Sequence, residues 1–219
     1  MSKNKYNKPI WGTRIKKDSA SLFRKVGGSL PIDKRLFNED IQGSIAHVEM
    51  LHKQKIINFR IKNKIIWALK RTRNEIIKKK FNFNYDLEDI HMNIENRLFE
   101  LIGEDAGYVH TARSRNDQVI TDLKLWLKVS TNKIIKLLEN TNSNILNLAA
   151  KNVKTIMPGL THLKNAQPIS FGHYLLAYVE MFKRDKKKFS NNVEFLDENP
   201  LGVCALSGTS FNIDRNYTT

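Results

Sequence analysis

One ten-residue stretch, 110–119, holds an unusual density of side chains that bind or transfer charge. Its sequence, HTARSRNDQV, is followed directly by an apolar-periodic run typical of a helix. A helix that begins here would present free backbone N–H groups and the positive end of its dipole. Arg113 and Arg115 add planar guanidinium groups suited to carboxylates. Two interpretations stay open: an ordinary helix start capped by Ser114, Asn116 or Asp117, or a binding site for a carboxylate-bearing ligand.

The segment GLTHLKNAQP (159–168) contains a second candidate, the pair Thr161 and His162. A histidine titrates near neutral pH and can therefore act as an acid or a base, although a single histidine is often a packing residue. The Thr161 hydroxyl could donate a hydrogen bond to a ligand carboxylate. Prolines and a glycine in 157–168 predict that both residues lie in a loop.

Two shorter patterns carry weaker signals. In LEDIHM, Asp89 and His91 are two residues apart and do not share a helix face, whereas His91 and the glutamate four residues later do. An ordinary surface pair is the default interpretation of the latter. In VGGSLPIDKRL, a turn at 27–28 either exposes Ser29 and Asp33 or is a plain loop.

Metal and nucleotide motifs are missing from the sequence. His47 and His52 are five residues apart, which is not the spacing of zinc peptidases. The sequence has no phosphate-binding glycine loop, no dinucleotide fingerprint and no nucleophile elbow. We expect neither a metal nor an organic cofactor.

Composition narrows the class of protein. The chain has 219 residues with 41% hydrophobic content and no apolar run of the roughly 20 residues that a membrane span needs. The basic start MSKNKYNKPIWG lacks an apolar signal core, and the single cysteine, Cys204, cannot form an intrachain disulfide. We therefore expect a cytoplasmic protein that contacts no membrane.

The net charge of +15 favours an acidic partner. Lysines spread over solvated helix faces explain much of this charge, with local basic runs at 76–85 and 182–190. No nucleic-acid motif accompanies them, so we expect no nucleic-acid partner. A small anionic ligand would also profit from the positive field.

Helical periodicity dominates, and strand alternation is nearly absent. Segment 38–57 is broadly helical, and segment 85–103 is more regular, with Asp86 as a possible N-cap and Gly103 as the end. The run 115–150 contains neither glycine nor proline and predicts a helix roughly 50 Å long.

The long helices indicate a bundle. A second one is predicted to begin after Ser170 and to reach about Asp197. The sequence thus predicts an all-α fold, with a helical N-terminal domain over 1–112 and the first part of a central helical bundle over 113–219. Two antiparallel helices alone would expose apolar faces, so we expect self-association.

Several segments together resemble the argininosuccinate lyase family of the fumarase/aspartase superfamily, and the resemblance covers essentially the whole chain. HTARSRNDQ is its most specific motif. The segments are EDIHMNIENRLFELIGEDAGYVHTARSRNDQVITDLKLWL (88–127), MPGLTHLKNAQPISFGHYLLAYVEMFKRD (157–185), PLGVCALSGTSFNIDR (200–215), DIQGSIAHVEML (40–51) and, more loosely, IWGTRI (10–15).

The resemblance implies reversible cleavage of argininosuccinate to arginine and fumarate, the last step of arginine biosynthesis and a step of the urea cycle. This β-elimination needs no metal or organic cofactor. A proton leaves the carbon beside a succinyl carboxylate, the guanidinium nitrogen departs from the next carbon, and negative charge builds on the carboxylate. Preorganised donors aimed at that charge supply most of the catalysis.

The resemblance also implies roles for individual residues. His162 matches the histidine usually named as the proton acceptor. Four other positions match substrate-contacting residues: Ser29, Arg115, Asn116 and Thr161. Arg113 is expected to set the local charge, and the remaining pocket candidates are Asp33, Asp89 and His91.

One part of the family pattern is not found. Members carry a third signature, a mobile Gly-Ser-Ser loop followed by Met-Pro-x-Lys-x-Asn, which supplies a catalytic serine; it is absent from these 219 residues. In the family, each active site combines three signatures from three subunits of a homotetramer. The resemblance therefore predicts an N-terminal portion of a lyase, without the remaining bundle helices and the C-terminal domain. The alternatives are a catalytically incompetent fragment or a non-catalytic, crystallin-like structural protein.

Overall fold

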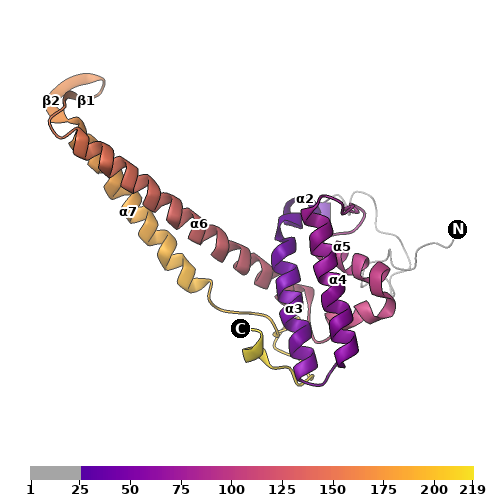
Figure 1. Cartoon of the computed structure of the whole chain (residues 1–219). Helices are drawn as coiled ribbons and strands as arrows, with labels where there is room; N and C mark the ends of the chain where they lie inside the picture. The colour runs from indigo at the N-terminus through magenta and orange to yellow at the C-terminus, as the bar shows by residue number, and fades with distance from the viewer. Residues whose placement is uncertain (1–25) are drawn as a thin grey trace. The chain divides into compact units, whose positions relative to one another are not determined.

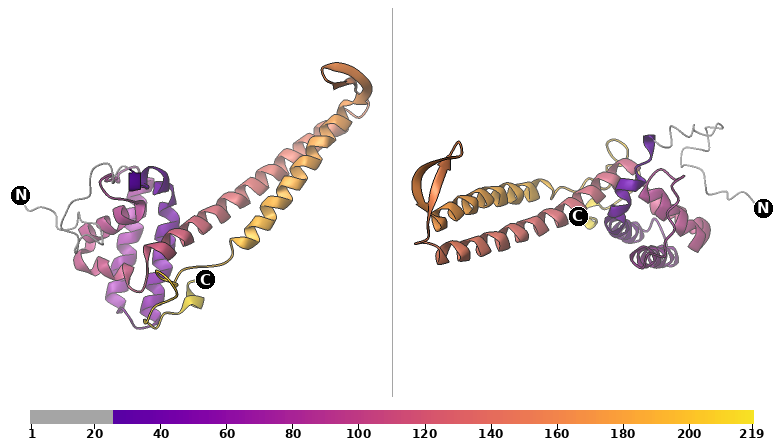
Figure 2. Two further views of the ribbon diagram at one scale, coloured as in Figure 1. Left: turned by 180° about the vertical axis from the view of Figure 1, so that it is seen from behind. Right: turned by 90° about the horizontal axis from the view of Figure 1, so that it is seen from above.

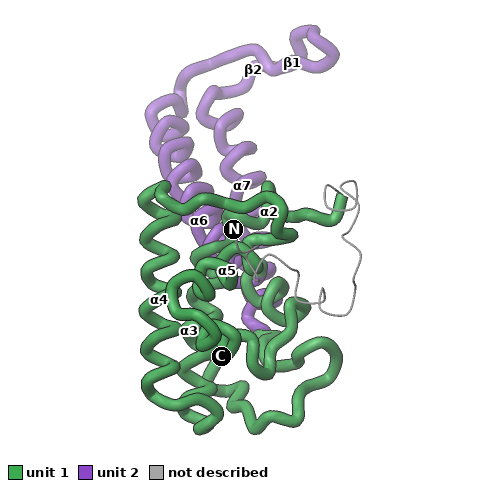
Figure 3. The backbone as a smooth tube through the Cα atoms, turned by 90° about the vertical axis from the view of Figure 1, so that its right-hand side faces the viewer, with its two compact units in different colours: residues 1–123, 199–219 green, residues 124–198 purple. Residues whose placement is uncertain are grey.

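The computed structural model describes residues 26–219, which form two compact units (Figure 3). The first unit contains residues up to Leu123 together with Asn199–Thr219, and the second contains Lys124–Glu198. The IWGTRI motif and the basic start of the chain lie outside the described residues.

The first unit is built around three helices that pack on one another, α3, α4 and α5 (Figure 1). Its core consists of aliphatic side chains from these helices; Val48, Ile65 and Ile90, for example, are fully buried. The helices of this unit before α6 are α2 (Leu30–Asp33), η2 (Lys34–Leu36), α3 (Phe37–Lys53), α4 (Phe59–Ile77), α5 (Ile90–Ile102) and η3 (Gly103–His110).

The start of α5 differs from the predicted one. Asp86 is not its N-cap; the cap is Asp89, whose Oδ1 accepts a hydrogen bond from the Met92 backbone N–H at 2.6 Å. The preceding residues stay outside the helix because the Glu88 carbonyl accepts from the backbone N–H of Ser29, at 2.8 Å. The predicted end is confirmed: Gly103 adopts φ +66°, a left-handed conformation that glycine reaches without strain.

Two long helices confirm the predicted pair. Helix α6 (Arg115–Lys151) begins in the first unit and continues into the second, where its later part lies beside α7 (Phe171–Phe195) in both Figure 1 and Figure 2. Ser170 caps α7 as predicted, since its hydroxyl accepts from the His173 N–H at 3.1 Å. At Gly172 an added Cβ would lie 2.8 Å from the Ala149 carbonyl oxygen, so this close approach requires glycine.

The predicted loop at 157–168 is wrong. An antiparallel hairpin occupies the segment, formed by β1 (Ile156–Thr161) and β2 (Lys164–Ser170). Its prolines, Pro158 and Pro168, lie opposite each other and are tolerated because both strands of this two-stranded sheet are edge strands. Gly159 sits at a register shift, where a Cβ would lie 2.7 Å from the Gln167 carbonyl oxygen. The all-α class holds apart from this two-stranded sheet.

After α7, the chain rejoins the first unit and ends with the short helix η4 (Arg215–Tyr217). Among residues 26–219, no helix combines the length and the apolar character that crossing a membrane requires.

Candidate functional site

Two side chains, those of Ser114 and Asp117, cap the start of α6 through reciprocal hydrogen bonds. The Ser114 hydroxyl accepts from the Asn116 backbone N–H at 3.2 Å, and Asp117 Oδ1 accepts from the Ser114 N–H at 2.9 Å. This reciprocal arrangement is a capping box with aspartate in the place of glutamate. The capping interpretation of the motif is thus confirmed, and it leaves the Asn116 side chain exposed beside the helix start.

The second carboxylate oxygen of Asp117 binds the backbone of a loop that is distant in sequence, at residues 202–204. Asp117 Oδ2 accepts from the backbone N–H groups of Gly202, at 3.0 Å, and Cys204, at 2.8 Å. The Asn116 amide lies 3.5 Å from the Ala205 carbonyl oxygen, so this loop borders the helix start. Burial, and then the charge of Asp117, raise the pKa of the Cys204 thiol, which disfavours a reactive thiolate.

Arg115, the first residue of α6, is surrounded by acceptors. Its Nη1 donates to Gln118 Oε1 at 2.7 Å and to Glu95 Oε1 at 3.2 Å, while Nη2 donates to Glu95 Oε2 at 3.3 Å. Its Nε lies 3.2 Å from Asp89 Oδ2. Four of the five N–H groups of the guanidinium therefore face protein acceptors, and the second N–H of Nη2 has no acceptor among residues 26–219.

Glu95 is the main counter-ion of Arg115. It also pairs with His110, whose Nδ1 lies 3.1 Å from Glu95 Oε1. Burial would raise the pKa of Glu95, but the His110 hydrogen bond and the Arg115 charge outweigh it, so the pKa is lowered. Glu95 therefore stays ionised at neutral pH, and its charge helps to hold the Arg115 guanidinium at the start of α6.

Arg113 is buried two residues before the start of α6 and contacts α3. Its Nη1 donates to Ser44 Oγ on α3 at 2.9 Å, and its Nε has no hydrogen-bond partner among the described residues. Its charge lowers the pKa of Asp40, together with His91. Arg113 thus lies next to buried polar groups of this unit.

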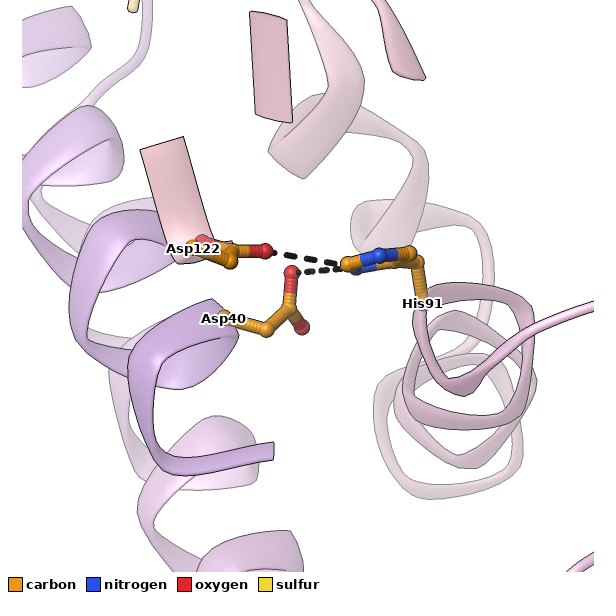
Figure 4. A group of neighbouring side chains, drawn as sticks. All are labelled: Asp40, His91 and Asp122. Atoms are coloured by element: carbon orange, nitrogen blue, oxygen red, sulfur yellow. Dashed lines mark hydrogen bonds and ion pairs between the residues drawn. The ribbon is translucent and has the colours of Figure 1, made fainter. Parts of the chain in front are cut away.

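His91 is not part of a surface pair, so that default interpretation is wrong. It is 1% exposed, and its Nδ1 lies 2.9 Å from Asp40 Oδ1 and 3.5 Å from Asp122 Oδ2 (Figure 4). The expected i, i+4 partner, Glu95, pairs with Arg115 and His110 instead. The reason is that the His91 face of α5 packs inward, where Asp40 of α3 and Asp122 of α6 provide buried acceptors.

The two buried aspartates differ in protonation. Burial, followed by the charge of Asp40, raises the pKa of Asp122 to about 10, so Asp122 is a neutral acid. Asp40 is equally buried, but His91, Arg113 and Gln118 outweigh the burial and lower its pKa. The two carboxyl groups therefore share one proton, as closely spaced acids do.

The same three residues are the group, among residues 26–219, whose donor atoms could hold a metal ion. One ligand atom from each of Asp40, His91 and Asp122 lies within 4.8 Å of the others. Hydrogen bonds already engage Asp40 Oδ1, which accepts from His91 and from Gln118. The neighbouring Arg113 charge, felt by both aspartates, also opposes a cation. The cluster is better suited to hold a proton.

Ser29 and Asp33 lie against the start of α5. The Ser29 hydroxyl donates to Asp33 Oδ2 at 2.5 Å, and Asp33 Oδ1 accepts from the Ile90 N–H at 3.2 Å. Burial is the main cause that raises the pKa of Asp33. Ser29 itself is exposed. The structure thus brings Ser29 and Asp33 next to Asp89, whose Oδ2 faces Arg115.

Thr161 and His162 belong to the second unit. Both are exposed, Thr161 at the end of β1 and His162 in the two-residue turn that follows. His162 and Leu163 adopt φ +50° and +62°, the left-handed pair typical of a type I′ hairpin turn. Such backbone conformations are strained for residues other than glycine and often occur at functional positions.

Sequence reasoning missed four residues of this network, which are Asp40, Glu95, Asp117 as a loop anchor, and Gln118. The signal for Gln118 and Asp117 was present, since both lie in HTARSRNDQ. Asp40 begins DIQGSIAHVEML, another segment of the resemblance. Their partners could not be read from spacing, because 78 residues separate Asp40 from Gln118.

The structure thus defines a helical protein with two long adjacent helices and a guanidinium–carboxylate network at the start of one of them. The chain belongs to the lyase family, whose model, described as "Lyase", matches residues 13–219. Its relatives are named argininosuccinate lyase: the protein of Pelagibacter ubique is 66% identical over 219 residues, and that of Ehrlichia canis is 48% identical over 209 residues. These matches cover 100% and 95% of this chain.

The solved structures agree in fold. An EDDS lyase in complex with formate superposes with a TM-score of 0.73 at 26% identity, over 84% of this chain and 36% of that one. The chain spans about half the length of the curated relatives it matches, 47% of the Pelagibacter protein and 44% of the Ehrlichia protein.

Proposed function

We propose that this chain contributes to an argininosuccinate lyase, which cleaves argininosuccinate to arginine and fumarate by β-elimination. The observation that supports this most strongly is the 66% identity with the Pelagibacter ubique protein of that name along the whole chain. The reaction needs donors for developing carboxylate charge, and the α6 start offers them. We propose a place in arginine biosynthesis, a cytoplasmic location and no metal or organic cofactor.

We assign the roles as follows. Asn116 is exposed at the α6 start, with a single long hydrogen bond from its amide to Ala205, and it binds a substrate carboxylate. Arg115 supplies positive charge and its remaining Nη2 hydrogen. The exposed Thr161 hydroxyl donates a hydrogen bond to the ligand, and the exposed Ser29 hydroxyl does so by exchanging its bond with Asp33 for one with the ligand. His162 accepts the proton, and Arg113, Asp33, Asp89 and His91 support the pocket.

We also propose that the protein works as a homotetramer with active sites shared between subunits. Residues 1–112 form an N-terminal domain, and 113–219 form the first part of the bundle domain. The exposed apolar side chains of α6 and α7, such as Leu137, Leu148 and Leu176, favour association because they lie unpartnered on long helices. A molecular mass of four chains by light scattering is the expected result.

The test of activity completes the chain with the portion of the Pelagibacter ubique relative that lies beyond its match. The joined protein should release fumarate from argininosuccinate, followed by ultraviolet absorbance. Substituting His162→Asn should lower turnover severely, by about a hundredfold or more for loss of a general base. Helix content should stay intact by circular dichroism.

The matched control is His173→Asn. His173 is an exposed histidine on α7, and its hydrogen bond to Ser170 uses the backbone N–H rather than the ring. Its substitution should leave turnover unchanged. Absence of fumarate release from a folded, tetrameric joined protein would refute the proposed activity, and near-normal turnover of His162→Asn would refute the role of that residue.

A further inference from the structure

The side-chain amide of Gln118 is held at both ends. Its Oε1 accepts from Arg115 Nη1 at 2.7 Å, and its Nε2 donates to Asp40 Oδ1. Gln118 is 2% exposed and Asp40 is 1% exposed, so water does not compete for either contact. A continuous hydrogen-bonded chain therefore runs from Asp40 on α3 to the guanidinium at the start of α6.

The direction of these hydrogen bonds follows from which groups can donate and which can accept. An amide has one donating and one accepting end, whereas an ionised carboxylate only accepts. His91 and Arg113 lower the pKa of Asp40, so its carboxylate is ionised and requires the NH2 end of Gln118. The accepting oxygen must then face Arg115. The opposite amide orientation would place two acceptors together at Asp40 and two donors together at Arg115.

Gln118 adds the shortest contact of Arg115 to those that Glu95 and Asp89 make. Glu95 lies on α5 and Asp89 is the N-cap of that helix; their contact distances of 3.2 to 3.3 Å are longer than the 2.7 Å contact with Gln118. Gln118 lies on the same helix as Arg115, three residues on. The Gln118 hydrogen bond thus ties Nη1 to the helix that carries Arg115 and restricts rotation of the guanidinium plane.

We propose that Gln118 and Asp40 are positioning residues that set the orientation of the Arg115 guanidinium, so that its remaining Nη2 hydrogen is presented to a substrate carboxylate. The assignment of that carboxylate rests on the proposed function. The orientation of Arg115 in the ligand-free protein does not depend on the proposed function, and it can be measured without any ligand.

The experiment follows the Arg115 Nη1 proton that is donated to Gln118, by nitrogen-15 NMR in the 219-residue chain. In the parent protein this proton should exchange slowly with solvent. Gln118→Met keeps the length of the side chain but removes both hydrogen bonds, and it should speed the exchange about tenfold, as expected when a local contact opens. Gln42→Met, at an exposed glutamine of α3, should change nothing and serves as the matched control.

Exchanging the donor and the acceptor between positions 118 and 40 distinguishes a positioning role of Gln118 from a general effect on stability. Gln118→Glu places two acceptors together at Asp40, and the repulsion between them should displace the side chain at position 118 and so loosen the orientation of Arg115. Adding Asp40→Asn supplies an amide donor to the carboxylate introduced at position 118. That carboxylate still accepts from Arg115, so the double variant should recover slow exchange to within about twofold of the parent. The double variant also covers the case in which Gln118→Met does not fold.

Unchanged Arg115 exchange in folded Gln118→Met would overturn the proposal, and so would a double variant no slower than Gln118→Glu alone. In the joined enzyme, Gln118→Met should raise KM for argininosuccinate more than it lowers kcat. If Arg115 loosens but KM stays the same, positioning stands while the role of Arg115 at the substrate fails.

Discussion

The carboxylate of Asp117 lies 2.8 Å from the backbone nitrogen of Cys204, although 87 residues separate the two in sequence. The contact joins the capped start of α6 to the loop after Asn199, and both segments carry motifs of the lyase family. Since the same aspartate also caps Ser114, one buried side chain couples the helix start to the loop that borders Asn116.

Asp117→Asn should destabilise the chain by about 2–4 kcal/mol, because a carboxylate that accepts three backbone N–H groups is replaced by an amide with one accepting end. Urea denaturation measures the change in the free energy of unfolding. Amide exchange should also accelerate at Gly202 and Cys204. Asp86→Asn, at an exposed aspartate, is the control and should have little effect. Equal effects of the two substitutions would contradict this role.

The sequence was sufficient to predict the long helices, because periodicity and caps are local properties. Ser170 and Gly103 act as predicted. The hairpin could not be predicted in this way, since the pairing of Pro158 with Pro168 depends on register between two strands rather than on composition. The environment of His91 was missed for a related reason: its acceptors come from α3 and α6, which only tertiary packing brings together.

Asp122→Asn should stabilise the protein at neutral and higher pH. The pKa of Asp122 is about 10 in the folded chain, against an ordinary value of 3.8. A raised folded pKa contributes stability fully below pH 3.8, and this stability is lost as the pH rises toward 10. Asparagine is neutral at every pH and can donate to Asp40 as the protonated acid does.

The expected gain for Asp122→Asn is at least about 1 kcal/mol at neutral pH, and it should shrink as the pH is lowered toward about 5. Thermal and urea unfolding across this range provide the measurement. A variant less stable than the parent at about pH 8 would show that an ionised Asp122 is needed in the cluster.

Acidification should destabilise the protein through His47. This side chain is 1% exposed, and its Nε2 donates to the Thr111 carbonyl at 2.8 Å. Burial, and then the charges of Arg113 and His110, lower the pKa of His47 from 6.5 to about 3, although the hydrogen bond to the Thr111 backbone acts to raise it. A lowered folded pKa means that the stability is complete above pH 6.5 and is lost as the pH falls toward 3.

At about pH 5 the loss should be about 2 kcal/mol relative to neutral pH. His47→Gln keeps a donor for Thr111 but cannot take up a proton, so its free energy of unfolding should fall less over the same interval. Urea denaturation at both pH values checks this. The same pH dependence in parent and variant would assign the loss to other groups.

Leu163→Gly should stabilise the β1–β2 hairpin. Leu163 is 96% exposed and adopts φ +62°, so its side chain contributes little burial while its Cβ strains the turn.

Leu163→Ala is the matched control, because it also removes the exposed side chain but keeps the Cβ. We expect glycine to favour the closed hairpin over alanine by about 1 kcal/mol, reduced somewhat by the greater freedom of glycine in the open state. Amide exchange in β1 and β2 should then be about fivefold slower in the glycine variant than in the alanine variant. Exchange that is equal in the two variants, or faster with glycine, would mean that the left-handed turn at His162 and Leu163 is not under strain.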